Sequence, residues 1–512
     1  MSAIVAAHGS IDAAECVEML DNLAHRGPDG SEVRGVADTW LGYRHLDLSG
    51  NGSDALPLHD PDRRSWFIAD GTIFDAHRLR RELEEQGEAT RTDADLELVL
   101  RLLVSEGADA LARIRGMFAF AMAGEDGGFV AGRDLLGLVP LYWYRDDDLV
   151  LFASELKAFH PKRRHGVEPF PPGHVWTPEA GLRRFRSLDR PLDEQVTSLI
   201  DRKGEVQEPP EEVLAMLRTT LISAVRRCLD TDAPVGVLLS GGLDSSLVTA
   251  IAADIAQREG RRLPTFSVGL EGSDDLAAAK EVASCLGVEN LERTYTEDEL
   301  IDWVPEVIRV LESFDPRLVQ SAVPNLLVSR FAARDVKVLL IGEGADELFA
   351  GYSQYEDIDS REQLQKALLG TIEEVHTGGL QRVDRIAAAN GVQSRMPFLD
   401  IDVYELGFAL PPAWKLANGR VEKWMLRQAF QGWLPDDILW REKAQFGEGS
   451  GAREILREHY GGLIGQDEFE AECGLVEPPL RSREELAYFR IFRQELEGVD
   501  PAAVIARWKD TS

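Results

Sequence analysis

The sequence predicts an α+β domain followed by an α/β domain that is built on a parallel sheet. Short strands separated by turns fill the first part of the chain, whereas in the second part helical stretches alternate with compact apolar strands. This alternation favours βαβ units, because a strand reaches a parallel neighbour through a crossover helix. A polar, proline-containing stretch separates the two patterns. We therefore assign residues 1–186 and 211–512 to two domains and residues 187–210 to a linker.

The N-terminal domain is predicted to be a mixed antiparallel fold. Turn clusters such as Asp60-Pro-Asp62 and Gly124–Gly128 separate its short strands. Two stretches, 11–24 and 92–107, carry apolar residues at helical spacing. Strands with few helices between them usually pair antiparallel, so this half is expected to be α+β.

The C-terminal domain is predicted to contain a parallel sheet with strands at 235–239, 264–269 and 336–341. Each of these segments is a compact apolar run flanked by helical stretches. In open parallel sheets, ligands bind beside the carboxyl ends of the strands. We therefore expect the functional residues of this domain to follow these strands.

Composition limits the possible partners. The chain has 89 acidic and 56 basic residues, a net charge of −33, which excludes nucleic acid because phosphate binding needs a basic surface. No apolar run approaches the roughly 18 residues of a membrane span, and the N-terminus lacks the features of a secretory signal. The four cysteines are widely spaced, which indicates neither disulfides nor a zinc site. We expect a cytoplasmic homo-oligomer without membrane contact and without a structural metal.

The acidic excess has two interpretations. It could form a docking surface for a basic partner, or a solvated surface suited to a salt-rich cytoplasm, where salt screens the self-repulsion. We favour the second interpretation. It predicts that stability and activity increase with added salt, and full folding and activity in dilute buffer would contradict it.

Residues 235–250 carry the clearest functional signal. Val235–Leu239 predicts a buried strand, Ser240–Gly242 a short loop, and the residues that follow the start of a helix. Because Gly241 and Gly242 carry no side chains, backbone N–H groups can approach a phosphate, and the helix N-terminus adds positive charge. The Lys-Ser/Thr ending of a Walker motif is missing. The segment instead resembles the pyrophosphate-binding loop of ATP pyrophosphatases, which cleave ATP to AMP and pyrophosphate in order to adenylate a substrate.

A second predicted strand is followed by carboxylates. Residues 338–352 combine an apolar strand, a glycine loop and the acidic side chains of Glu343, Asp346 and Glu347. Carboxylates that face a polyphosphate repel it unless a cation lies between them, and Mg²⁺ is usually held by one or two carboxylates plus phosphate oxygens. Asp244 and Asp346 are therefore the candidate Mg²⁺ ligands.

Two further segments fit nucleotide chemistry. Lys443 precedes the glycine-rich stretch 447–451, and a lysine there can neutralise charge on phosphates and on a tetrahedral intermediate. Arg395 lies beside a rigid proline turn. Each segment alone has a structural explanation. Because all of them follow the pyrophosphate loop in one chain, their joint occurrence favours a role in the same chemistry.

Taken together, these motifs resemble the glutamine-type asparagine synthetase family over nearly the whole chain. In the C-terminal half the resemblance lies in the pyrophosphate loop, Phe266–Asp274, Gly342–Glu347, Arg395–Asp400, Glu422-Lys423 and Lys443–Phe446. In the N-terminal half it lies in His25–Gly30, Arg115–Phe120, Gly132–Asp134 and Ser154–Lys157. The resemblance implies a four-layer αββα domain of the N-terminal-nucleophile (Ntn) hydrolase type, similar to class II glutaminases, joined to an α/β domain of the ATP-pyrophosphatase type.

The resemblance also implies a reaction. Aspartate and ATP would give β-aspartyl-AMP and pyrophosphate, and ammonia would attack the adenylate to give asparagine, with ATP and Mg²⁺ as cofactors. By matching position, pyrophosphate would be bound by Ser240, Gly241, Gly242, Asp244, Ser245 and Ser246, and the ATP pocket would be lined by Leu238, Val268, Ile341 and Gly342. Glu343 would be the base that deprotonates the attacking ammonia, and Lys443 would stabilise the intermediate and its leaving group.

The N-terminal domain departs from the family at its expected glutaminase site. The family has a nucleophilic cysteine after the initiator methionine, whose freed α-amine acts as the base, whereas this chain has Ser2, which is harder to activate. The family's glutamine-binding Arg-Leu-Ser-Ile begins here with His45. Its oxyanion-hole segment Asn-Gly-Glu is Asp70-Gly71-Thr72 here, and a carboxylate would repel an oxyanion. Asp95 still matches the residue that holds the glutamine amine. We therefore interpret this domain as a degenerate glutaminase retained for packing, for oligomerisation or for admitting free ammonia.

The acceptor pocket also departs from the family. Gln320 stands where the family has an arginine, Ile341 where it has a serine and Gln393 where it has a glutamate. Without this arginine the identity of the carboxylate substrate stays open, because a bidentate arginine would ordinarily bind the α-carboxylate of aspartate. β-Lactam synthetases, which are relatives that also lack the cysteine, have a tyrosine at the position of Glu343. The glutamate therefore favours capture of ammonia or an amine.

Three functions stay open. The leading hypothesis is an ATP-dependent amide ligase of asparagine synthetase type that uses free ammonia and adenylates aspartate or a similar carboxylate. The second is the same adenylation chemistry on another carboxylate or with an organic amine, as in β-lactam synthetases. The third is a non-catalytic scaffold or regulatory paralogue, which the retained charged residues of the ATP site argue against. ATP–pyrophosphate exchange separates the third hypothesis from the others, and product identity separates the first two.

Overall fold

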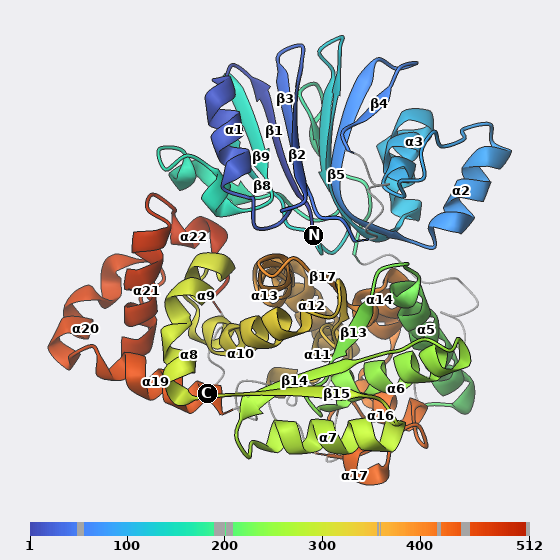
Figure 1. Ribbon diagram of the computed structural model, residues 1–512, viewed down its shortest axis with the longest axis vertical. Helices are drawn as coiled ribbons and strands as arrows, with labels where there is room; N and C mark the ends of the chain where they lie inside the picture. The colour runs from blue at the N-terminus through green and yellow to red at the C-terminus, as the bar shows by residue number, and fades with distance from the viewer. Residues whose placement is uncertain are drawn as a thin grey trace.

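The computed structural model describes residues 1–48, 56–188, 200, 208–355, 358, 360–416, 421–441 and 451–507. Most of the predicted linker and the whole segment around Lys443 therefore lie outside the described residues. Figure 1 shows the N-terminal strands above the C-terminal domain, with helix α13 (Gly379–Ala388) directly beneath the N-terminus.

The N-terminal domain contains two antiparallel sheets of six strands each. The order of the first sheet is β10 (Val167–Pro169), β8 (Tyr142–Arg145), β9 (Leu149–Ala153), β1 (Ala3–Gly9), β3 (Thr39–His45) and β2 (Gly30–Val36). The order of the second is β12 (Gly181–Arg184), β11 (His174–Thr177), β7 (Phe129–Arg133), β6 (Arg115–Gly124), β5 (Ser65–Phe74) and β4 (Leu58–Asp60). The sheets lie face to face, since β1 and β3 contact β5 and β6, and buried side chains such as Phe67 and Phe120 belong to this domain's core.

Helices cover the outer faces of both sheets. Helix α1 (Ala13–Asp21) contacts β1 and β3, while α2 (Ala76–Glu85) and α3 (Glu97–Glu106) lie on the side of β4 and β5 (Figure 1). The αββα arrangement that the family resemblance implies is thus confirmed. Helices were predicted within 11–24 and 92–107, but α2 was not, because Leu79 and Leu83 are almost its only apolar side chains. Their burial against the domain core stabilises a helix whose other residues are mostly charged.

The C-terminal domain is built on a five-stranded parallel sheet. Its order is β15 (Asn290–Tyr295), β14 (Thr265–Leu270), β13 (Val235–Leu238), β16 (Val338–Leu340) and β17 (Gln393–Arg395). The chain adds strands on one side of β13 and then crosses to its other side with β16. Strands β13, β14 and β16 confirm the three predicted strands. Strands β15 and β17 were not predicted, because both are rich in polar residues and neither shows an apolar run.

Helices pack on both faces of the parallel sheet, as the alternation of side chains in β16 shows. Val338 and Leu340 belong to one hydrophobic cluster, together with residues of α5 (Glu211–Leu229) and α6 (Leu243–Arg258). Leu339 belongs to another cluster, together with residues of α9 (Val304–Leu311) and α10 (Pro316–Ala332). A strand that is buried on both faces is expected in a doubly wound α/β domain.

The remaining helices complete the C-terminal domain. They are α7 (Asp274–Leu286), α8 (Glu297–Asp302), α11 (Ala345–Leu348), α12 (Arg361–Glu374), α14 (Ile401–Ala409), α15 (Pro412–Lys415), α16 (Trp424–Ala429), α17 (Asp436–Leu439), α19 (Ala452–Gly462), α20 (Gln466–Glu472), α21 (Arg483–Glu495) and α22 (Pro501–Val504). Among the described residues, no helix combines the length and the apolar character that crossing a membrane requires.

Candidate active site

Two loops meet where the order of the parallel sheet reverses. Strand β13 has β14 on one side and β16 on the other, with Val237 opposite both Thr265 and Leu340. The loop after β13 leads into α6, and the loop after β16 leads into α11. At such a switch point the two connections leave the sheet in opposite directions, so a crevice opens beside the carboxyl ends of the strands. Both loops were predicted from the sequence to bind nucleotide.

The loop after β13 is shaped by hydroxyl groups. Ser240 Oγ lies 3.0 Å from Ser245 Oγ, and Ser245 Oγ accepts a hydrogen bond from the Ser240 N–H at 3.3 Å. Gly242 caps the N-terminus of α6. Ser246 Oγ is buried and makes no hydrogen bond within the described residues. A buried hydroxyl without a partner, beside a helix N-terminus, is a donor suited to an anion.

Glycine is required in both loops by close packing. Gly241 has φ +75°, and a Cβ atom there would lie 2.5 Å from Ala278 Cβ of α7. A Cβ on Gly342 would lie 2.8 Å from the backbone nitrogen of Ser245. The loop after β16 is thereby held directly against the first turn of α6, and the two predicted binding segments become neighbours.

The acidic segment after β16 lies beside the first turn of α6. Lys423 Nζ lies 2.5 Å from Asp244 Oδ2 and 2.7 Å from Asp346 Oδ1, so one ammonium joins the two predicted Mg²⁺ ligands. Glu347 is buried and accepts a hydrogen bond from Tyr352 Oη at 2.6 Å. Burial, together with repulsion from Glu343 and Asp346, raises the pKa of Glu347 to about 7.

The predicted base, Glu343, is held by an arginine that the sequence analysis did not select. Arg382 Nη2 of α13 lies 2.8 Å from each carboxylate oxygen of Glu343. Gly379, the first residue of α13, packs so closely that a Cβ on it would lie 2.7 Å from Glu343 Oε1. The carboxylate therefore faces the positive end of a helix as well as a guanidinium. Both contacts fix its orientation beside the loop.

The other predicted nucleotide residues lie in or directly after three neighbouring strands of the parallel sheet. Leu238 ends β13, Val268 is a buried residue of β14, and Ile341 and Gly342 directly follow β16. Lys443 lies outside the described residues. Arg441, the last described residue before it, donates a hydrogen bond to the Gly241 carbonyl oxygen at 3.3 Å.

A buried carboxyl group lies behind this loop and predicts a pH dependence. Asp275, in the first turn of α7, is 6% exposed, and burial raises its pKa from 3.8 to about 7 although Arg441 opposes the shift. The folded state therefore binds more protons than the unfolded state between these values, and its stability falls as pH rises through this window. We expect Asp275→Asn to have a higher Tm than the wild type at about pH 8, with a smaller difference at about pH 5. Glu281→Gln, at an exposed position of the same helix, is the control, and equal pH profiles for the two variants would contradict the expectation.

The departures in the acceptor pocket have specific partners. Gln320 is buried and donates to Glu484 Oε1 at 2.8 Å. Gln393 Oε1 accepts hydrogen bonds from Thr72 Oγ1 and from Arg395 Nε, both at 3.0 Å. Thr72 and Gln393 are both positions where the family has a glutamate, so the two departures lie in contact across the domain boundary. Arg395 itself is buried and donates to the Cys228 carbonyl oxygen, a structural contact.

Of the predicted glutaminase residues, His45 lies near Ser2, whereas Asp95 makes a separate pair. Ser2 is buried, and its Oγ accepts hydrogen bonds from Tyr43 Oη at 2.9 Å and from the Leu46 N–H at 3.2 Å. Within the described residues, neither an imidazole nor a carboxylate is hydrogen-bonded to this hydroxyl. His45 lies 3.4 Å from Tyr43 Oη instead. Asp95 is exposed and paired with Arg80 of α2 at 3.0 Å.

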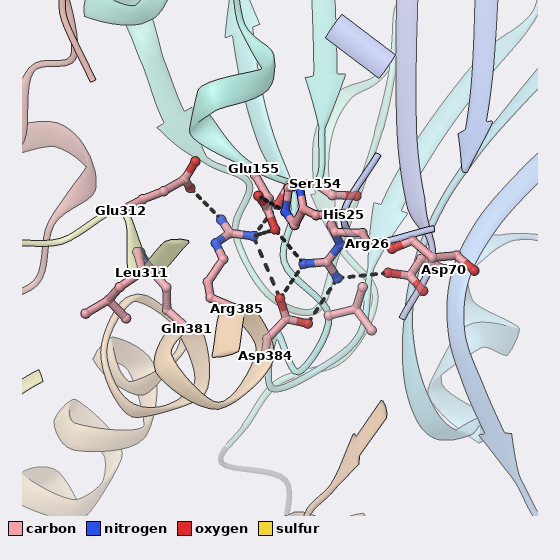
Figure 2. Close-up of polar contacts among 12 residues, drawn as sticks. His25, Arg26, Asp70, Ser154, Glu155, Leu311, Glu312, Gln381, Asp384 and Arg385 are labelled. Atoms are coloured by element: carbon pink, nitrogen blue, oxygen red, sulfur yellow. Dashed lines mark hydrogen bonds and ion pairs between the residues drawn. The ribbon is translucent and has the colours of Figure 1, made fainter. Parts of the chain in front are cut away.

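A buried ionic network around Arg26 extends into the C-terminal domain (Figure 2). The side chain of Arg26 is fully buried, and its Nε donates to the Ser2 carbonyl oxygen at 2.9 Å. Its other nitrogens lie 3.2 Å from Asp70 Oδ2, 2.9 Å from Glu155 Oε1 and 2.6 Å from Asp384 Oδ2. Because Asp384 belongs to α13, this arginine joins the two domains.

The network contains a second arginine, and its buried carboxylates depend on the neighbouring positive charges. Arg385 of α13 lies 2.9 Å from Glu312 Oε2 and 3.2 Å from Glu155 Oε1 (Figure 2). Burial alone would raise the pKa of Glu155, but His25, Lys157 and Arg385 hold it well below its usual value. Burial raises the pKa of Asp70 even though Arg26 opposes the shift. Asp70 is therefore a carboxylate that needs Arg26.

Several residues of both sites were not selected from the sequence. Arg26, Glu155 and Lys423 lie inside segments that were quoted for the family resemblance, but nothing in the sequence indicates their partners. Asp384 and Arg382 lie in a helix without any motif. Gly71 was selected for its family position, and its φ of +136° and a Cβ that would lie 1.9 Å from the Met117 carbonyl oxygen show that only glycine fits there.

Comparisons with known proteins cover both domains. The asparagine synthase family model matches residues 216–368 and 356–498, and the model of the glutamine amidotransferase domain matches residues 1–170. Asparagine synthetase [glutamine-hydrolyzing] 2 of Arabidopsis thaliana is 35% identical over 484 residues, which are 90% of this chain and 81% of that protein. Asparagine synthetase [glutamine-hydrolyzing] of Sandersonia aurantiaca is 34% identical over 452 residues, which are 85% of this chain and 83% of that protein.

Proposed function

The chain belongs to the asparagine synthase family, and from this premise we propose that it is an ATP-dependent amide ligase that forms AMP and uses free ammonia. It adenylates aspartate or a similar carboxylate, releases pyrophosphate and transfers ammonia to the activated carbonyl carbon. The observation that carries this proposal is the meeting of the Ser240–Ser246 loop with the acidic segment after β16 at the switch point of the sheet.

The residues present fit magnesium nucleotide. Ser246 supplies a buried hydroxyl without a partner among the described residues, next to the N-terminus of α6, where pyrophosphate oxygens would bind. Asp244 and Asp346 both contact one ammonium, so they are close enough to share one divalent cation together with phosphate oxygens. When bound, Mg²⁺ would neutralise charge that develops on the phosphates.

The roles of the other residues follow from charge and position. Glu343 takes a proton from the attacking ammonia, and Arg382 holds its carboxylate in one orientation. Leu238, Val268, Ile341 and Gly342 line the adenosine side of the pocket. Lys443 provides positive charge for the intermediate from the segment that follows Arg441.

We attribute no glutaminase activity to the N-terminal domain. The hydroxyl of Ser2 accepts two hydrogen bonds, and even with the residue's own α-amine as the base a serine hydroxyl is harder to activate than the family's thiol. Asp70 carries a carboxylate where the family stabilises an oxyanion, and Arg26 binds this carboxylate rather than leaving a donor for substrate. Ammonia would then come from solution.

The direct test is pyrophosphate release from Mg·ATP in high-salt buffer, with aspartate plus ammonium compared with aspartate plus glutamine. We expect release with ammonium only, with asparagine as the product, and an unchanged ammonium-dependent rate in Ser2→Ala. Glutamine-driven turnover would overturn the loss of glutaminase activity. Absence of release with aspartate under either nitrogen source would overturn aspartate as the acceptor.

A second candidate function is the same adenylation on another carboxylate or with an organic amine. The buried pair of Gln320 and Glu484 favours it, because a glutamine amide stands where the family has an arginine for the α-carboxylate. A screen of carboxylates for ATP–pyrophosphate exchange tests it. Strongest exchange with an acid that lacks an α-carboxylate would favour this candidate over asparagine synthesis.

A further inference from the structure

Lys423 occupies an unusual position between the two candidate metal ligands. Its side chain is 2% exposed, and its ammonium contacts Asp244 in the first turn of α6 and Asp346 in α11. Its own backbone precedes α16 and has φ 57° and ψ 33°, in the left-handed region that a residue with a side chain rarely adopts. Three distant segments therefore meet at one buried charge, and the backbone of the lysine is strained to bring it there.

Gly351 packs closely against this ion pair. A Cβ atom on Gly351 would lie 2.0 Å from Asp346 Oδ1 and 2.4 Å from Lys423 Cε. Glycine at this position is therefore required by the ion pair itself, not by its backbone angle. Burial alone would lower the pKa of Lys423, but Asp244 and Asp346 outweigh it, so the lysine stays charged well above neutral pH.

Charge explains why a cation is needed at this point. Two carboxylates that face each other repel, and without a cation between them they would turn apart or take up protons. The distances of 2.5 Å and 2.7 Å show that one ammonium contacts both of them. A divalent cation could bind the same two carboxylates, but it would bring two positive charges, whereas the ammonium brings one.

We propose that Lys423 is a built-in counter-ion that keeps Asp244 and Asp346 facing each other until magnesium nucleotide binds. The part of this inference that concerns magnesium rests on the proposed function, whereas the part that concerns the ion pair does not. A lysine that holds both carboxylates competes with free Mg²⁺, so the metal enters only together with nucleotide. When the metal takes over the two carboxylates, the phosphate oxygens of the nucleotide become the new anionic partners of the ammonium.

The test compares two buried lysines of the same domain by thermal unfolding without nucleotide, in EDTA and with MgCl₂. Lys423→Met removes the counter-ion, and Lys415→Met removes a buried ammonium that donates to the Phe408 carbonyl oxygen. We expect both variants to have a lower Tm in EDTA. Millimolar Mg²⁺ should raise the Tm of Lys423→Met by about 3 °C or more, and the Tm of the wild type and of Lys415→Met by less than about 1 °C.

Each outcome decides the proposal. A Lys423→Met protein that shows no response to Mg²⁺, or a wild type that responds equally, would overturn it. If Lys423→Met does not fold, Lys423→Gln replaces it, because it removes the same positive charge but keeps a donor beside the two carboxylates, and the same Mg²⁺ response is expected. Pyrophosphate exchange by the wild type is measured separately, so failure of the proposed reaction is distinguished from failure of the counter-ion role.

Discussion

Replacing Glu343 by glutamine is expected to lower the rate of amide formation by about 10²–10⁴-fold while ATP–pyrophosphate exchange persists. Glutamine keeps the size of the side chain and one oxygen that can accept from Arg382, but it cannot take a proton from ammonia. Adenylation of the carboxylate needs no such base. The measurement is ammonium-dependent product formation beside carboxylate-dependent pyrophosphate exchange, on the same preparation.

The control for this variant is Glu373→Gln on α12, which removes an exposed glutamate of the same domain. It should leave both rates unchanged. Equal loss of exchange and amide formation in Glu343→Gln would show that Glu343 binds substrate or metal instead of acting as the base. Arg382→Met should lower amide formation without abolishing it, because the carboxylate remains but loses the contact that orients it.

The loops of the candidate site in the C-terminal domain could be predicted because their signals are local. A buried strand, a glycine turn and a helix start follow one another within residues 235–250, and the same order recurs around 338–352. The physical requirements of such a turn, a positive φ at Gly241 and close packing at Gly342, fall on residues that the sequence identifies directly. The relative position of the two loops then follows from the order of a parallel sheet.

The charged partners could not be predicted, because they depend on distant segments. Lys423 is 179 positions from Asp244, and Arg26 is 358 positions from Asp384. An arginine or lysine in a sequence is compatible with a solvated surface as well as with a buried pair, and only the fold decides which. Strand β17 was missed for a related reason. Its polar residues Gln393 and Arg395 are buried by contacts with Thr72 and with the Cys228 carbonyl oxygen, which no periodicity indicates.

Replacing Arg26 by methionine is expected to destabilise the protein by about 3–5 kcal/mol, the cost of breaking a buried ion pair from one side. The change would leave Asp70, Glu155 and Asp384 buried around an apolar side chain. Because Asp384 belongs to α13 and the other two belong to the N-terminal domain, the two domains should also unfold less cooperatively. Scanning calorimetry would detect both the lower Tm and a separation into two transitions.

The matched control is Arg44→Met, which removes an arginine of the same domain from a pair with the exposed Asp21. A pair of this kind contributes at most about 1 kcal/mol, so the Tm should change little. The double variant Arg26→Met/Asp384→Asn should recover part of the loss, since it removes one of the stranded carboxylates along with its partner. If Arg26→Met were no less stable than Arg44→Met, the network would not hold the domains together. The buried carboxylate of Asp70 would then need an explanation other than stability. The size of the difference therefore measures how much the buried network around Arg26 contributes to the contact between the two domains.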